Sequence, residues 1–264
     1  MIEELKYVIL GAIQGVAEFF PISSSGHTTL FSSIFKVAEN QPLLFVITLH
    51  FATTLSTMIV YRNRIKEIVL GALIKKKKFT LSFLLKLMTS AIPIAIVGFT
   101  CKSNIDELFA NGNQIVSYML LVTAIILLIS KYAKSSDSEV TYKSAILMGL
   151  AQTIAIIPGI SRSGATITTA LFCGTNRKKA AEFSFLMVLV PIIGMTCIEI
   201  LELNSSRNIH LSPMELKGLI LAFISAVISG WIACKYMIII VEKNHLNYFG
   251  YYCLIIGIIS LLFI

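Results

Sequence analysis

Two polar stretches of this chain repeat each other at an offset of 138 residues (149 − 11). GAIQGVAEFFPISSSGHT at 11–28 and GLAQTIAIIPGISRSGAT at 149–166 align without a gap and share eight of eighteen residues. Most of the shared residues are small or polar, whereas 56% of the whole chain is hydrophobic, so chance is a poor explanation. The two stretches are copies in an internal repeat, and the chain has to fold around both.

The sequence around both copies is suited to lipid. Only 14% of the residues are charged and the mean hydropathy is +0.83, whereas a soluble domain has roughly a quarter of its residues charged. Six apolar segments are long enough to cross a bilayer as helices: 43–61, 79–100, 114–131, 182–202, 215–238 and 247–264. We therefore predict an all-α integral membrane protein, with the lipid bilayer as a partner.

The repeated stretches interrupt two further apolar regions, 5–36 and 144–175, with Pro, Gly and Ser in the middle. Each region is predicted to be a re-entrant helical hairpin that enters and leaves the membrane on one side. Three spans separate the hairpins, and because three is odd the second hairpin must be inverted. The predicted fold is six transmembrane helices plus two re-entrant helical hairpins in an inverted-topology repeat. Its halves are 1–131 and 132–264, within a single membrane domain, 1–264.

The net charge of +8 comes from clusters of Lys and Arg between the apolar runs. The clusters lie in 62–78, 131–143, 177–179 and 239–246. Nucleic-acid binding is another explanation of a basic chain, but basic clusters in short loops are typical of the cytoplasmic face of a membrane protein. We predict no nucleic-acid partner and place both termini outside, so that the first hairpin enters from outside and the second from the cytoplasm.

The two hairpin tips carry groups that suit an anion. Broken helices in inverted repeats commonly place a ligand site where they meet. The chain is predicted to resume as half-helices at 27–36 and 165–174, with their positive N-termini toward the shared centre. Arg162 adds a planar set of donors suited to phosphate oxygens. The other candidate binding groups are the hydroxyls and backbone amides of the tips: Ser23, Ser24, Ser25, Gly26, Gly159, Ser161, Ser163 and Gly164.

The first tip also carries groups suited to chemistry. Gln14 and Glu18 are four residues apart and share one helix face. A carboxylate at membrane depth indicates function, and beside an anion it needs either a metal ion or a proton. His27 titrates near neutral pH and is a candidate acid or base. Together with the hydroxyls and Arg162, this set suits hydrolysis of a phosphoryl group.

Structural roles are the alternatives at several of these positions. Ser25 and Ser163 are as well explained by close helix packing. A purely structural ion pair is the lesser alternative for Glu18 and Arg162. Three hydroxyls are expected to bond back to their own helix: Thr53, Thr54 and Thr57. Two residues stay undecided between core and site: His50 and Glu182.

QGVAEFFPISSSGH and PGISRSGAT resemble the two signature stretches of the bacterial undecaprenyl-diphosphatases of the bacitracin-resistance type. AAEFSFLMVLVP at 180–191 is similar to the family's stretch after the second signature, and the resemblance covers essentially the whole chain. It implies hydrolysis of undecaprenyl diphosphate to undecaprenyl phosphate and inorganic phosphate at the outer face of the bacterial plasma membrane. That reaction recycles the lipid carrier of cell-wall synthesis and confers bacitracin resistance. The resemblance also implies a divalent cation, Mg²⁺ or Ca²⁺.

Carried over by position, the resemblance implies roles for six residues: Glu18 as the essential acidic residue, Ser24 as the nucleophile, His27 as acid/base or alternative nucleophile, and Arg162 as the diphosphate ligand, supported by Ser161 and Thr166. Gln14 stands where some relatives have a second glutamate. A metal ion on Glu18 and Gln14 would therefore have one carboxylate and one amide oxygen.

The sequence leaves three questions open. It does not choose between a covalent phosphoserine on Ser24 and direct attack by water. The rival function is a membrane transporter or flippase for a lipid phosphate, the usual role of such repeats. The concentration of Glu18, Ser24 and His27 in one tip argues against it, because a carrier needs no base next to a hydroxyl. The oligomeric state is also open, a homodimer included.

Overall fold

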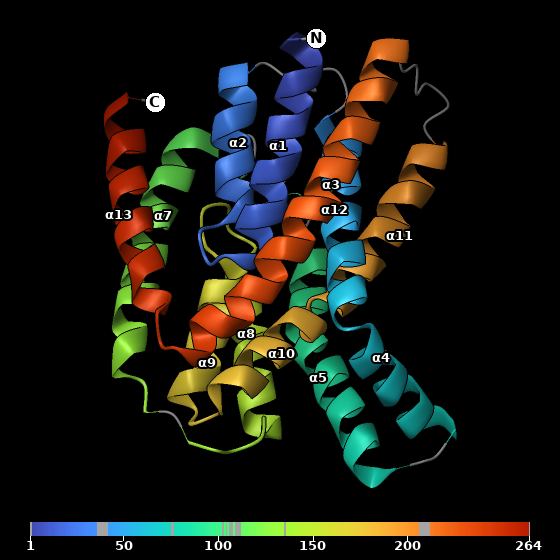
Figure 1. Cartoon of the computed structure of the whole chain (residues 1–264), viewed down its shortest axis with the longest axis vertical. Coiled ribbons are helices and arrows are strands. Elements are labelled where there is room, and N and C mark those ends of the chain that lie inside the picture. Colours follow the sequence, from blue (N-terminus) through green and yellow to red (C-terminus); the bar gives the residue numbers. More distant parts are fainter. Residues whose placement is uncertain are drawn as a thin grey trace.

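The computed structural model of the chain is built of helices (Figure 1). It describes residues 2–35, 42–74, 77–101, 103, 105, 108, 112–134, 136–205 and 212–263. Position 36 of the first predicted hairpin and positions 75 and 76 of the first basic segment lie outside these ranges. The described residues contain no β-strand beyond a single bridge between Ser138 and Thr175. The prediction of an all-α protein is confirmed.

The predicted spans have counterparts among the helices. Five helical stretches are long and apolar enough to cross a membrane, and a bent helix pair makes a sixth. The five stretches lie in α5 (Lys78–Thr100), α7 (Gly112–Ile129), α10 (Arg177–Met187) with α11 (Leu189–Ser205), α12 (Pro213–Glu242) and α13 (Leu246–Phe263). The bent pair is α3 (Pro42–Val60) and α4 (Arg62–Val69), which turn by 78° relative to each other. Short turns of other helix types cover Leu70–Ile74 and Ser130–Tyr132.

The span predicted at 182–202 consists of two helices instead of one. α10 ends at Met187 and α11 begins at Leu189, with Val188 between them. Pro191 explains the interruption, because a proline ring clashes with the carbonyl four residues earlier, here that of Met187. The break matters for the site, since α10 and α11 approach the hairpin tips around this point.

The two predicted hairpins are present and opposed. α1 (Ile2–Phe19) and α2 (Ser24–Phe35) form the first, and α8 (Tyr142–Ile154) and α9 (Arg162–Phe172) form the second. In Figure 1 the first hairpin lies toward the end that holds both termini, and the second lies toward the opposite end. The tips meet between them, because a Cβ placed on Gly26 would lie 3.4 Å from the Cα of Gly159.

Both half-helices begin three residues earlier than predicted, at Ser24 and Arg162 instead of 27 and 165. The preceding serine accounts for each start: Ser23 Oγ accepts the Gly26 N–H at 3.2 Å, and Ser161 Oγ accepts the Gly164 N–H at 3.1 Å. A serine that satisfies the third amide of a helix stabilises its first turn. The tip residues that directly follow Ser23 and Ser161 therefore belong to the first turns of α2 and α9.

Each hairpin packs against a long helix from the other half of the sequence. A Cβ on Gly11 of α1 would overlap the backbone of Ala222 on α12, and a Cβ on Gly149 of α8 would overlap the backbone of Ser90 on α5. Gly11 and Gly149 are equivalent positions of the repeat (149 − 11 = 138). The hairpins are therefore held at close backbone distance by the opposite half. The division into 1–131 and 132–264 itself stays a prediction from the repeat.

Candidate active site

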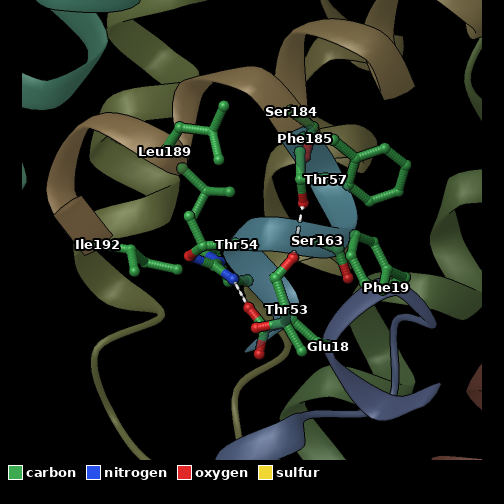
Figure 2. Close-up of a pocket in the computed structure, with 12 residues that line it drawn as sticks. Glu18, Phe19, Thr53, Thr54, Thr57, Ser163, Ser184, Phe185, Leu189 and Ile192 are labelled. Atoms are coloured by element: carbon green, nitrogen blue, oxygen red, sulfur yellow. Dashed lines mark hydrogen bonds and ion pairs between the residues drawn. The ribbon is translucent and has the colours of Figure 1, made fainter. Parts of the chain in front are cut away.

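An ion pair joins the two hairpin tips. Arg162 Nη2, at the first position of α9, donates to Glu18 Oε1 near the end of α1, and a dashed line at Glu18 marks this contact in Figure 2. Glu18 is only 8% exposed, and a buried carboxylate needs such a partner to remain charged. The structure thus brings together the acid of one copy and the cation of the other.

The second oxygen of Glu18 collects donors from its own hairpin. Ser24 Oγ donates to Glu18 Oε2 at 2.7 Å and Gln14 Nε2 donates to the same atom at 3.0 Å. Gln14 reaches it because it lies one helical turn before Glu18, and Ser24 because the chain reverses between α1 and α2. His50 Nδ1 of α3 lies 4.0 Å from the same oxygen. Hydroxyl, carboxylate and guanidinium form one hydrogen-bonded chain, Ser24–Glu18–Arg162.

The remaining tip hydroxyls shape the two turns in the same way in both copies. Ser25 and Ser163 each place a hydroxyl 3.3 Å from the cap serine of their own tip. Thr166 Oγ1 donates to the carbonyl of Arg162 at 2.8 Å and lies 2.6 Å from the hydroxyl of Ser184 on α10. These hydroxyls already have partners, which fits the structural role left open for Ser25 and Ser163.

The second tip is held from the side by α7. Thr123 donates to the Gly159 carbonyl at 2.8 Å and accepts the Ser161 N–H at 2.9 Å. Gly159 has a φ of +98°, and a Cβ there would come within 2.5 Å of the Val116 carbonyl oxygen. Glycine is therefore required at 159 by both backbone conformation and space.

A small cavity lies beside the ion pair. Its volume is about 10 Å³, which is room for about one water molecule. Figure 2 shows Glu18 together with Thr53, Thr54 and Thr57 of α3 and with apolar residues of α10 and α11 such as Phe185 and Ile192. A diphosphate is larger than this cavity, so its binding there requires the lining side chains to move.

This chain matches the family model described as bacitracin resistance protein BacA over residues 7–259. The chain belongs to the BacA family. A protein of Bacteroides fragilis named undecaprenyl-diphosphatase is 40% identical, over 98% of this chain and 97% of its own length. Proteins of the same name from Christiangramia forsetii and Halothermothrix orenii are 39% and 36% identical, each over at least 96% of both chains.

Within this BacA family chain, His27 lies apart from the Ser24–Glu18–Arg162 chain. Its Nδ1 lies 2.9 Å from the Ser23 carbonyl and its Nε2 lies 2.9 Å from the Tyr252 hydroxyl of α13. Both ring nitrogens are therefore occupied by groups other than Ser24 and Glu18. The structure therefore brings Ser24, and not His27, to Glu18, and the role of His27 as acid, base or nucleophile stays a prediction.

The two residues left undecided by the sequence go to different places. His50 belongs to the site, since its Nδ1 is buried without a hydrogen-bond partner among the described residues and faces Glu18. Glu182 belongs to a surface cluster, because its Oε1 accepts from Arg64 Nε of α4 at 2.6 Å. Its partner is therefore on α4, and among the described residues it forms no ion pair with Arg162 of the second tip.

Sequence reasoning missed Ser184 and Tyr252 and misjudged one threonine. Thr53 and Thr57 bond back to their helix, as expected. Thr54 differs, because its buried hydroxyl has no partner among the described residues. Ser184 lies within AAEFSFLMVLVP, the stretch that resembles the family sequence after the second signature. The sequence therefore contained a signal for Ser184. Tyr252, one of three tyrosines in the apolar helix α13, carried none.

The donor set gives limited support for a resident metal ion. The described residues contain no group of three His, Cys, Asp or Glu side chains placed to hold one. Gln14 turns its amide nitrogen toward Glu18, and a metal ion on these two residues stays a prediction. Glu18 and Ser24 supply hard oxygen donors, which suit a cation that arrives together with a diphosphate.

Proposed function

We propose that this protein hydrolyses undecaprenyl diphosphate to undecaprenyl phosphate and inorganic phosphate. Relatives that carry the name of this activity match the chain over nearly its full length. The observation that carries the proposal at the atomic level is the 2.7 Å hydrogen bond from Ser24 to Glu18, whose other oxygen pairs with Arg162. A base, a hydroxyl and a guanidinium in contact are the parts that phosphoryl hydrolysis needs.

The diphosphate competes with Glu18 for Arg162. Its oxygens suit the planar guanidinium, and the N-termini of α2 and α9, which begin at Ser24 and Arg162, favour negative charge. Once Arg162 turns to the phosphate, Glu18 loses its cationic partner and becomes a stronger base. The substrate thereby activates the residue that has to take a proton.

Glu18 then receives the proton of Ser24, or of a water molecule in its place. The oxygen attacks the terminal phosphorus in line with the departing undecaprenyl phosphate, while Arg162 and the helix N-termini stabilise the charge on the transferred phosphoryl group. If Ser24 is the nucleophile, a water molecule hydrolyses the phosphoserine in a second step. The lipid tail stays in the bilayer throughout.

A divalent cation, Mg²⁺ or Ca²⁺, would be held by Glu18, Ser24 and the oxygens of the diphosphate. When bound, it supplies positive charge to the phosphoryl oxygens. The support is the oxygen-donor chemistry of Glu18 and Ser24, which lie 2.7 Å apart.

The protein would lie in the bacterial plasma membrane with both termini outside and the first hairpin open to the outer face. The basic segments support this orientation. In Figure 1 α4 and the start of α5 lie at the end opposite to the termini, and a positively charged end is typical of the cytoplasmic side.

Phosphate release from undecaprenyl diphosphate by the purified protein, in detergent with Mg²⁺, tests the proposal. We expect Glu18→Gln to reduce the rate by roughly a thousandfold or more, as loss of a catalytic base does. Glu242→Gln is the matched control, because this carboxylate lies at the surface end of α12, 3.4 Å from Lys178. A protein that binds the lipid and releases no phosphate would contradict the proposal and favour a carrier.

A further inference from the structure

The first tip holds its cap serine in a backbone conformation that the equivalent serine of the second tip lacks. Ser23 has a φ of +69°, which among the described non-glycine residues only Asn244 shares in sign. Left-handed backbone is unfavourable for a residue with a Cβ and persists only where its surroundings enforce it. The equivalent residue of the second tip, Ser161 (23 + 138), has an ordinary φ of −74°.

His27 holds the strained residue in place. The Ser23 carbonyl accepts the backbone N–H of His27 at 3.1 Å and also lies 2.9 Å from His27 Nδ1. A carbonyl can only accept, so Nδ1 carries a proton and donates it. In the neutral ring Nε2 is then an acceptor, and the Tyr252 hydroxyl at 2.9 Å is its donor. The Ser23 carbonyl thereby fixes the ring form, and the Tyr252 hydroxyl holds the ring in place by donating to Nε2.

α13 supports this contact in two further ways. The rings of His27 and Tyr252 stack with an interplanar angle of 14° and centroids 5.6 Å apart. The neighbouring Cys253 places its Sγ 3.8 Å from the carbonyl of Pro21. The first tip is therefore attached to α13 on both sides of Ser23.

The second copy of the repeat serves as an internal comparison. The position equivalent to His27 is Ala165 (27 + 138). An alanine cannot take part in the clamp formed by His27 and Tyr252 on Ser23, and the cap serine of the second tip has no strained backbone to hold. The residue after the cap is Ser24 in the first tip and Arg162 in the second. The clamp thus occurs only in the tip whose next residue offers a hydroxyl to Glu18, whereas Arg162 donates to the same carboxylate through its guanidinium.

We propose that Tyr252 is a positioning residue for the hydrolytic site. Through His27 it holds Ser23 in the left-handed conformation, and this conformation aims the hydroxyl of Ser24 at Glu18. Tyr252 touches no reacting atom itself. The inference rests on the proposed function for its kinetic consequences, whereas its effect on the tip backbone does not depend on activity.

Hydrogen exchange of the intact protein in detergent tests the structural step without reference to activity. In Tyr252→Phe, amides of the peptide covering 20–28 should exchange faster than in the parent, while those of 158–166 should be unchanged. Tyr251→Phe is the matched control, because this neighbouring side chain is exposed on α13 and should leave both peptides unchanged. Equal exchange of 20–28 in the parent and in Tyr252→Phe would overturn the inference.

Kinetics test the positioning step. Tyr252→Phe should lower kcat by about tenfold and change KM by less than about twofold, because the loss is one of alignment. Glycine adopts the left-handed conformation without strain, so in a Ser23→Gly background the same substitution should cost less than about threefold. The inference would be overturned if Tyr252→Phe lowered kcat as much in the Ser23→Gly background as in the parent. Full activity of Tyr252→Phe would also overturn it. An inactive parent would instead contradict the proposed function. The hydrogen-exchange result would then decide whether Tyr252 holds the first tip through His27.

Discussion

Glu18 and Arg162, 144 residues apart in sequence, form an ion pair at the point where the two hairpins meet. The same carboxylate accepts the hydroxyl of Ser24. The sequence left a structural ion pair and a catalytic role as alternatives for Glu18 and Arg162. In the structure, one contact between these two residues fits both. In the closed protein it joins the tips, and it has to open when an anion takes Arg162.

Loss of Arg162 should destabilise the fold more than loss of both partners. Arg162→Met leaves the buried Glu18 unpaired, at a cost of about 3–5 kcal/mol. Glu18→Gln with Arg162→Met removes the stranded charge and should recover most of that stability. Unfolding in detergent, followed by circular dichroism, measures both. A double variant as unstable as Arg162→Met alone would contradict the role of the ion pair.

Close approach of α1 and α12 predicts opposite effects of two glycine substitutions. Gly11→Ala places a methyl group against the backbone of Ala222 and should destabilise the protein by about 1–3 kcal/mol, as overpacking does. Gly98→Ala on α5 meets nothing within 4 Å and should be neutral or stabilising by up to about 1 kcal/mol. Thermal unfolding of the two variants side by side checks this. Equal stabilities would mean that α1 and α12 are further apart.

The buried hydroxyl of Thr54 should serve the substrate. It is 4% exposed and has no partner in the described part of the chain, so a phosphate oxygen in the opened cavity would satisfy it. Thr54→Val should lower kcat/KM by about tenfold, the worth of one hydrogen bond to a charged group, without loss of stability. Thr48→Val is the control, since that hydroxyl bonds to the carbonyl of Leu44 at 2.7 Å. Full activity of Thr54→Val would place the substrate elsewhere.

Thiol labelling should reveal the orientation in the membrane. Variants that keep only Cys101, after α5, or only Cys173, after α9, place a thiol at the proposed outer and inner ends. An impermeant maleimide added to intact cells should label Cys101, and Cys173 only after lysis. Burial raises the pKa of the Cys173 thiol, so its reactive thiolate forms at higher pH and labelling above neutral pH is needed. Cys173 labelled in intact cells would reverse the orientation.

The sequence predicts the membrane class, the hairpins and the meeting of Glu18 with Arg162, because polar and small residues stand out in an apolar chain and the repeat links the two tips. It does not predict contacts that depend on packing between distant helices. Tyr252 lies 225 residues from His27, and no local pattern marks it. The break at Val188 was readable from Pro191, since the clash with Met187 is local. The half-helices begin earlier than predicted because Ser23 and Ser161 cap them.

Whether Ser24 and Glu18 act as one unit is tested most directly by the phosphate-release rates of Ser24→Ala, Glu18→Gln and the double variant. The 2.7 Å hydrogen bond predicts that the double variant is no slower than the slower single variant. If two residues act as a unit, removal of either one already removes their joint contribution to the rate. Losses that multiply in the double variant would show that Ser24 and Glu18 contribute independently, and would contradict the Ser24–Glu18–Arg162 site.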